Sequence, residues 1–261
     1  MVAFLATLAI VLATRALPRA RARLRALGRP PVWHFLGGLS GAALVLVSAT
    51  AAPEVGVALL TVALVSGSTG GSLPVDAAGL GPAGRRAVTP PRVAGVLLAI
   101  GATVISALGA RGDIDVLLLA LAFGTGGLMA LQAAANGQLA RATGEPWAAS
   151  LVNVAVGGFT VLGLVAVVTL ATTALNPMPG NPLLYAGGLL GAFVVVVGAT
   201  AVQTLGVLRL GLAMVAGQMA GALIVDLVAP APGEPVTAAT VVGVALTMVA
   251  VAISGRGQPR P

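Results

Sequence analysis

The chain of 261 residues is 58% hydrophobic and only 8% charged, with a mean hydropathy of +1.05. Soluble domains carry roughly 25% charged residues, so most of this surface does not face water. The absence of cysteine excludes disulfides and thiolate metal sites, and a single histidine, His34, leaves little for a histidine-based metal centre or triad. The net charge of +7 is accompanied by only 3% aromatic residues, which argues against nucleic-acid binding because stacking side chains are missing.

Apolar runs separated by short links predict nine membrane spans, since a bilayer core of ~30 Å needs about 20 apolar residues per helix. In chain order the predicted spans are Val2–Thr14, Trp33–Ala51, Val55–Leu73, Val93–Ala110, Val116–Ala135, Trp147–Leu175, Pro182–Gln203, Gly206–Val228 and Val236–Ser254. Prolines such as Pro53, Pro90 and Pro146 stand where these helices are expected to stop or start.

The first span and the arginines that follow it are unusual. The apolar run Met1–Thr14 is too short to cross a bilayer comfortably, and six arginines crowd the short loop Arg15–Arg29 behind it. A signal peptide carries its charges before the apolar run, so this order argues against one. Because Ala13–Leu17 is similar to Ala171–Leu175, we expect a first repeat that lacks its first helix.

The chain contains an internal repeat. The segment Gly37–Ala42 returns as Gly187–Ala192, 150 residues later, and the register then holds without a gap to Asp76 and Asp226. About half of the 40 aligned positions are identical, which is more than shared apolar composition gives. We therefore divide the chain into a first membrane repeat of four helices, residues 1–110, and a second of five helices, residues 111–261.

The arginines predict the orientation of the two repeats. If the loop Arg15–Arg29 is cytoplasmic, alternation through nine spans places thirteen of the fourteen arginines on that side, and only Arg111 outside. This topology puts the N-terminus outside and the C-terminus inside. The loop after Asp76 is then cytoplasmic and the loop after Asp226 external, so the two copies are predicted to be inverted, as in secondary transporters.

The residues also resemble a known family. The stretch Ala130–Ala140, followed by Glu145–Ser150, is similar to the opening of a repeat of the YdcZ type, and Gly187–Ala192 and Ala216–Asp226 are similar to its later helices. That family belongs to the drug/metabolite transporter (DMT) superfamily, whose members are built from duplicated helical units. The resemblance covers nearly the whole chain and implies an all-α, multi-pass small-molecule permease, often an exporter, in the bacterial inner membrane.

Sparse polar side chains inside the spans are the candidate substrate-binding residues. Gln132 and Asn136 are four residues apart and share one helix face, and Asn153 is expected to face Gln132 from the next span. The second group comprises Gln218, near the middle of its span, and its repeat partner Ser68 with the neighbouring Ser66. Each of these six side chains can either bind a polar solute or form hydrogen bonds between helices.

Glycines four residues apart predict close helix packing rather than chemistry. They are Gly37, Gly41, Gly67, Gly71, Gly187, Gly191, Gly217 and Gly221. The carboxylates Asp76 and Asp226 end their helices near opposite membrane faces. We interpret these two residues as interfacial anchors, with gating or proton handling as the alternative.

These observations favour a secondary transporter, with export as the favoured direction, of small metabolites or drugs. The alternative is a non-transporting membrane subunit or a degenerate remnant of such a transporter, because the first helix is missing. No HExxH, GxSxG or ATP-binding glycine motif occurs, so neither an enzyme nor an ATP-driven pump is expected. We expect no cofactor and no metal, with the lipid bilayer and a small molecule as partners, and the sequence leaves a homo-oligomer open.

Overall fold

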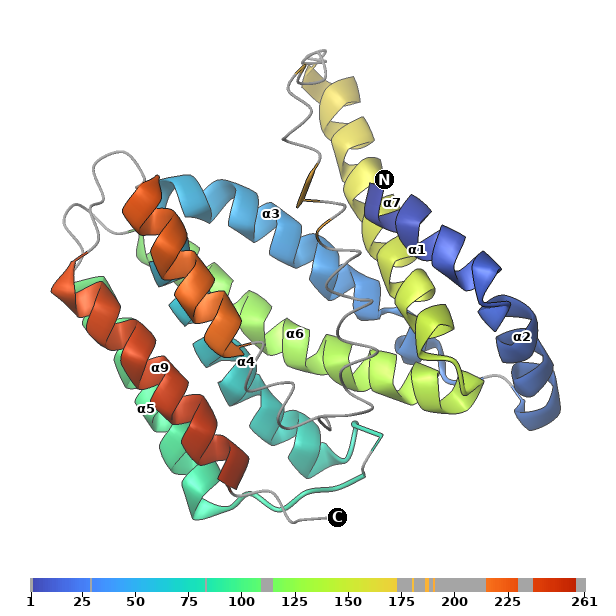
Figure 1. Ribbon diagram of the computed structural model, residues 1–261, viewed down its shortest axis with the longest axis horizontal. Coiled ribbons are helices and arrows are strands. Elements are labelled where there is room, and N and C mark those ends of the chain that lie inside the picture. Colours follow the sequence, from blue (N-terminus) through green and yellow to red (C-terminus); the bar gives the residue numbers. More distant parts are fainter. Residues whose placement is uncertain are drawn as a thin grey trace. The chain divides into compact units, whose positions relative to one another are not determined.

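The computed structural model describes residues 2–28, 30–82, 84–108, 115–172, 180, 186–187, 190, 215–229 and 237–256, which are mostly helical (Figure 1). Its elements are α1 (Val2–Ala13), α2 (Ala16–Leu27), the short 3-10 helix η1 (Val32–Phe35), α3 (Gly37–Val55), α4 (Val57–Ala78), α5 (Pro90–Leu108), α6 (Val116–Thr143), α7 (Pro146–Thr172), the helix Val215–Val228 and α9 (Ala238–Arg256).

Five of these helices are long and apolar enough to cross a membrane, namely Val32–Val55 (with η1), Val57–Ala78, Pro90–Leu108, Val116–Thr143 and Pro146–Leu170. Two shorter apolar helices, Val215–Val228 and Ala238–Ile253, follow in the second half. The predicted all-α, polytopic membrane bundle is therefore confirmed. The predicted span Pro182–Gln203, apart from residues 186–187 and 190, and the first part of Gly206–Val228 lie outside the described residues.

The chain forms two compact units, and each combines segments that are distant in sequence. Unit 1 consists of Met1–Ala42 and Gln132–Thr204, and unit 2 consists of Ala43–Leu131 and Leu205–Pro261. Each unit therefore contains segments of both predicted repeats. The predicted boundary between the two repeats, at residue 110, does not coincide with a boundary between these units, and it stays a prediction.

The arginine-rich segment is a helix, so the prediction of a short loop over Arg15–Arg29 was wrong. Helix α2 has the sequence ALPRARARLRAL, and Ala, Leu and Arg are among the strongest helix formers. Arg15 makes the tight turn from α1 with φ 52°, and Gly28 ends α2 with φ 89°. Concentrated charge suggested a loop, but alanine and leucine between the arginines give the segment a continuous helix with one apolar side.

Prolines mark some helix boundaries correctly. Helices α5 and α7 begin at Pro90 and Pro146, where the missing N–H of proline has no intrahelical partner to lose. Pro53 instead lies inside α3, which continues to Val55, so the predicted stop at Pro53 was wrong. Since the helix ends two residues later, the proline removes one hydrogen bond from the last turn and interrupts nothing beyond it.

Both ends of α4 are held by specific contacts within unit 2. At its start, the N–H groups of Val57 and Ala58 donate to Asp226 Oδ1 and Oδ2 at 2.9 and 2.6 Å. A carboxylate at this position satisfies two of the unpaired donors of a helix N-terminus and interacts favourably with the helix dipole. At its end, Gly79 takes φ 74° and Leu80 N–H donates to Val75 O at 3.1 Å, which closes the last turn.

An ion pair joins the end of α4 to the start of α5. Arg92 Nη2 lies 2.5 Å from Asp76 Oδ2, and only 4% of Arg92 is exposed. The sequence placed Arg92 in the basic loop, whereas α5 begins two residues earlier and contains it. Asp76 therefore fixes a connection between two helices, because a buried guanidinium needs a paired acceptor.

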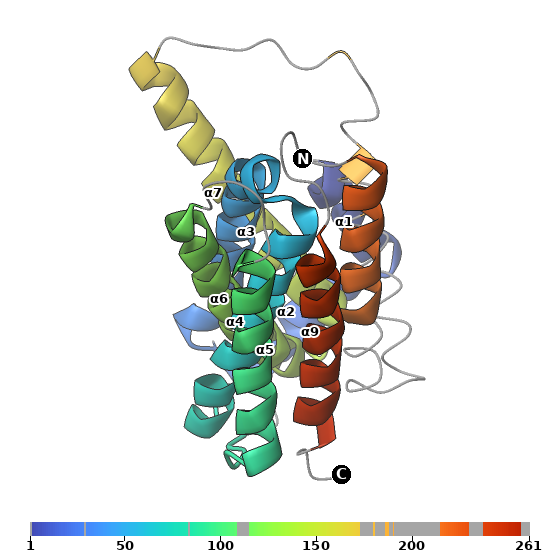
Figure 2. The ribbon, with the colours of Figure 1, turned by 90° about the vertical axis from the view of Figure 1, so that its left-hand side faces the viewer.

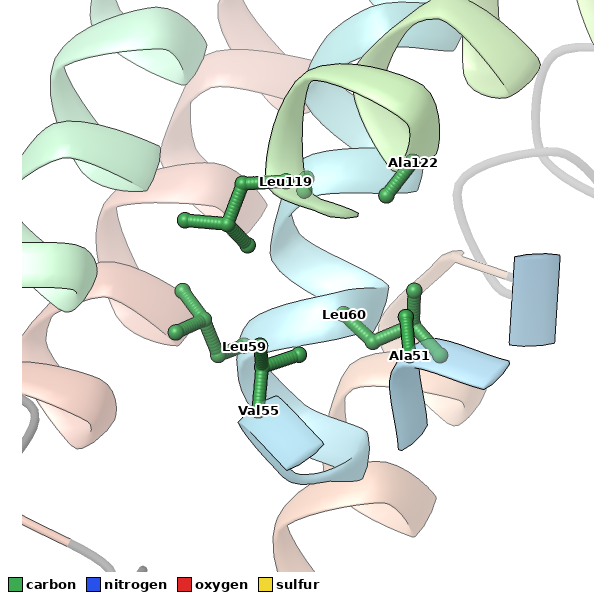
Figure 3. Packing of buried hydrophobic residues seen from close by; sticks show 7 residues of the cluster. Ala51, Val55, Leu59, Leu60, Leu119 and Ala122 are labelled. Atoms are coloured by element: carbon green, nitrogen blue, oxygen red, sulfur yellow. The ribbon is translucent and has the colours of Figure 1, made fainter. Parts of the chain in front are cut away.

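One core cluster of unit 2 combines leucine and valine side chains with alanines. The cluster Ala51, Val55, Leu59, Leu60, Ala63, Leu119 and Ala122 joins α3, α4 and α6 (Figure 3). Gly126 of α6 lies so close to α4 that a Cβ there would be 2.0 Å from Leu64 O. Helices α4 and α6 thus meet through their backbones.

Helices α5 and α9 lie side by side in unit 2, as Figures 1 and 2 both show. Gly243, near the start of α9, faces Ala102 and Ser106, near the end of α5. The two helices are therefore antiparallel. A similar relation holds between α4, which begins at Val57, and the helix Val215–Val228, whose Asp226 near its end contacts that beginning.

Replacing Gly126 by alanine should destabilise the protein, since the added methyl group would overlap Leu64 O. Overpacking of this kind costs about 1–3 kcal/mol. The matched control is Gly124→Ala, two residues earlier on α6, where a Cβ has no atom within 4 Å among the described residues. Thermal unfolding in detergent should show a clear loss for Gly126→Ala and none for Gly124→Ala. Equal unfolding temperatures would contradict the close approach of α4 and α6.

Replacing Asp226 by alanine should destabilise unit 2, because Val57 and Ala58 lose their acceptor. Loss of a helix cap costs about 0.5–2 kcal/mol. Leu227→Ala, at the adjacent exposed position, is the control. We expect the unfolding temperature in detergent to fall more for Asp226→Ala than for Leu227→Ala, and the reverse order would rule out the cap.

Candidate functional site

Three amide side chains come together in unit 1. Gln132 and Asn136 project from α6, and Asn153 projects from the second turn of α7. Gln132 Nε2 donates to Asn153 Oδ1 at 3.1 Å, so the predicted contact between these two residues is confirmed. All three side chains are half-buried within helices that are otherwise strongly apolar. We call Gln132, Asn136 and Asn153 the amide cluster.

Glycines of α3 form the opposite side of the amide cluster. A Cβ at Gly37 would lie 2.8 Å from Asn136 Oδ1 and 3.2 Å from Asn153 Oδ1. A Cβ at Gly41 would lie 3.8 Å from Gln132 Nε2, and one at Gly38 only 2.2 Å from Asn153 O. The first turns of α3 therefore approach α6 and α7 closely, because the glycines on this side of α3 carry no side chains.

The contact between the glycines of α3 and the amide cluster was not predicted from the sequence. Their spacing held a signal, since both Gly37/Gly41 and Gln132/Asn136 are one helical turn apart. When two helices pack side by side, residues one turn apart on one helix can lie opposite residues one turn apart on the other. Nothing in the sequence, however, said that these two helices are neighbours.

The amide cluster can form hydrogen bonds but carries no charge. Each amide offers one carbonyl acceptor and two N–H donors. One hydrogen bond joins Gln132 to Asn153, which leaves acceptor and donor groups on all three residues without a partner among the described residues. Such a cluster can hold a polar solute by hydrogen bonds without the cost of burying a formal charge.

The polar residues predicted on α4 lie in unit 2. Ser66 is completely buried, where it donates to Ala99 O at 2.7 Å and accepts from Thr103 Oγ1 at 2.8 Å. Its hydroxyl thus links α4 to α5, which is the interhelical role considered for this residue. Ser68 is half-buried beside Gly126, and Gln218 is exposed on its helix. A substrate contact for Ser66, Ser68 and Gln218 stays a prediction.

The remaining predicted packing glycines differ in their surroundings. Gly67 and Gly71 face the backbone of α6, where added Cβ atoms would lie 1.9 Å from Phe123 O and 2.7 Å from Gly127 Cα. Gly187, Gly217 and Gly221 have no neighbouring atom within 4 Å of such a Cβ in the part of the chain that the structure describes. Gly191 lies outside the described residues.

Metal coordination has no basis in the described parts of the chain, where no group of three or more His, Asp or Glu side chains is placed to hold an ion.

The chain matches a protein-family model. The family model described as "Putative inner membrane exporter, YdcZ" matches residues 1–105 and 117–253, which covers both predicted repeats and leaves out the segment between them. The resemblance seen in the sequence is thereby confirmed. No curated protein and no solved structure matches the chain.

The hydrogen bond between Gln132 and Asn153 predicts energetic coupling between α6 and α7. Gln132→Leu and Asn153→Leu should each lower stability by about 0.6–2 kcal/mol, the range for polar contacts between membrane helices. The double variant should cost less than the sum of the two single variants, because the second change removes no further bond. Thermal unfolding of the four proteins in one detergent gives the coupling energy. Strict additivity would show that the bond contributes nothing.

Proposed function

The chain belongs to the YdcZ family of inner-membrane exporters of the DMT superfamily, and we propose that it is a secondary transporter that exports small metabolites or drugs by alternating access. The amide cluster beside the glycines of α3 is the observation that carries this proposal. Polar side chains within a bilayer are costly, so a concentration of three of them needs a structural or a transport role.

We assign substrate binding to Gln132, Asn136 and Asn153. Joining two helices requires only a single donor and a single acceptor. The three amides offer more hydrogen-bonding groups than their one hydrogen bond uses. The free groups favour a solute that both donates and accepts hydrogen bonds. The absence of an acidic or basic side chain from the cluster favours a solute that is neutral where it meets these residues.

The arrangement of helices from the two repeats supports an inverted topology. Helices α5 and α9 are the last helices of their repeats, and they pack antiparallel. The helix Val215–Val228 is the repeat equivalent of the later part of α4, and its Asp226 meets the start of α4. Equivalent helices that run in opposite directions are what a pseudo-twofold axis in the membrane plane produces.

The membrane in which the protein resides and its orientation in that membrane rest on different observations. Residence in the inner membrane follows from the family. The placement of the N-terminus outside and the C-terminus inside is part of our proposal, and it is supported by the thirteen arginines that nine spans bring to one side.

Transport is tested by comparing the solutes released by cells that produce equal membrane amounts of the natural protein or of a variant. We expect mass spectrometry of the medium to show at least one small solute whose release needs the natural protein and falls about tenfold or more in Gln132→Leu and Asn153→Leu. Loss of one hydrogen bond of about 1.5 kcal/mol already predicts a tenfold change in affinity. Leu131→Ala, at the exposed neighbouring position of α6, should retain release.

Gln218→Leu in the same assay decides whether unit 2 contributes to binding. Reduced release by a variant that unfolds at the natural temperature would support the predicted contact. Unchanged release by Gln218→Leu would remove Gln218 from the site. Full release by a well-folded Gln132→Leu/Asn153→Leu double variant would overturn the assignment of the amide cluster, and no solute released by any protein would favour a non-transporting subunit.

A further inference from the structure

We propose that α2 binds the phosphate groups of anionic phospholipids at the membrane surface. The inference rests on unit 1 alone and is independent of the transport proposal. Three features carry it, which are the amphipathic pattern of α2, the different partners of its arginines, and its position at the ends of two long apolar helices.

Helix α2 has a buried apolar side and two basic flanks. Ala16 and Ala20 are 0% and 3% exposed, and Leu24 on the same side is half-buried. Successive residues of a helix are 100° apart, so Arg19 and Arg23 lie on one flank of this apolar side and Arg21 and Arg25 on the other. All four arginines are exposed. The apolar side thus fixes which way each flank faces.

The first flank is used by the protein itself. Arg19 Nε donates to Glu145 Oε1 at 2.5 Å, and its Nη2 donates to Oε2 at 3.3 Å, which is a two-pronged contact with one carboxylate. The guanidinium of Arg23 lies against Gly144. Arg19 therefore holds α2 to the connection between α6 and α7, and Arg23 lies in contact with the same connection.

The second flank has no partner in the described residues. Neither Arg21 nor Arg25 forms a hydrogen bond or an ion pair with any part of the chain that the structure describes. Two exposed guanidinium groups one helical turn apart repel each other unless an anion lies between or beside them. The flank is therefore complementary to a negatively charged partner that is not part of this unit.

The position of α2 identifies that partner. Glu145 and Gly144 lie between Thr143, which ends α6, and Pro146, which begins α7, and both helices have the length and hydropathy of membrane spans. Contact with these two residues places α2 where two spans end, which is the level of the lipid headgroups. A guanidinium binds phosphate through two parallel hydrogen bonds, and basic residues next to a span attract anionic lipids.

This role is distinct from the effect of the same arginines on topology. Positive charge directs insertion while the protein is made, whereas lipid binding persists in the folded protein. Charge alone would act equally through both flanks. Lipid binding as proposed depends on Arg21 and Arg25 more than on Arg19 and Arg23, which already contact the protein.

The test uses the purified full chain in mixed detergent micelles containing dioleoylphosphatidylglycerol or dioleoylphosphatidylcholine. Apparent affinity is measured from the rise in unfolding temperature as lipid is added. The variants are Arg21→Gln/Arg25→Gln and the matched pair Arg19→Gln/Arg23→Gln, which remove the same charge from opposite flanks. Glycerol phosphate replaces the lipid in a third series.

We expect the natural protein to prefer phosphatidylglycerol over phosphatidylcholine. Arg21→Gln/Arg25→Gln should weaken that affinity about 10- to 30-fold, the order expected for two arginines next to a membrane, and should unfold at the natural temperature without lipid. Arg19→Gln/Arg23→Gln should unfold at a lower temperature without lipid but keep most of the preference. Three results would overturn the proposal: equal loss in both variants, no loss in Arg21→Gln/Arg25→Gln, or equal stabilisation by glycerol phosphate.

Discussion

Close contact between helix backbones is the constraint on which this structure depends. Lipid removes the hydrophobic force that drives helices together in water, so membrane helices associate through van der Waals packing and a few polar contacts. In unit 2, Gly126 and Gly67 bring α4 and α6 into backbone contact. In unit 1, Gly38 does the same for α3 and α7. Close packing at small residues is a precondition for the polar contacts, because no amide or hydroxyl reaches its partner until the backbones are close.

The polar contacts then fix which surfaces meet. Ser66 reaches Ala99 O and Thr103 across the contact between α4 and α5, and Gln132 reaches Asn153 across the contact between α6 and α7. Asp226 goes further, since it holds the first two N–H groups of α4 from a helix 169 and 168 residues away in sequence. Each contact has one geometry in which it is satisfied, so packing that glycine leaves loosely defined becomes specific.

Sequence patterns predicted the helices well because lipid leaves the chain few alternatives. A long apolar run must satisfy its backbone internally, and α6 and α7 fall where Val116–Ala135 and Trp147–Leu175 were predicted. Errors arose where charge or proline was taken as a boundary. Concentrated arginine gave no loop at α2, and Pro53 did not end α3, because a helix tolerates both when its other residues favour it.

Contacts between helices that are distant in sequence were harder to predict than the helices themselves. The pair Gln132 and Asn153 was predicted because α6 and α7 are joined by a short link and must be neighbours. The cap at α4 was not, since nothing near Val57 in sequence indicates a carboxylate beyond residue 220. The amide cluster shows both cases, because its amides come from adjacent helices whereas the glycines opposite them come from α3, about 100 residues earlier in the chain.

This difference in origin bears on how the proposed transporter would move. Gln132 and Asn153 both lie in the predicted second repeat, so their hydrogen bond joins helices that the proposed alternating access would move together. Gly37 and Gly41 lie in the predicted first repeat and have no side chain with which to hydrogen-bond the amides. A glycine surface can slide past a neighbour without breaking polar contacts, whereas an amide pair cannot. In the proposed mechanism, the amides would therefore lie where the two predicted repeats move past each other at low cost, and a bound solute could be exposed to each side in turn.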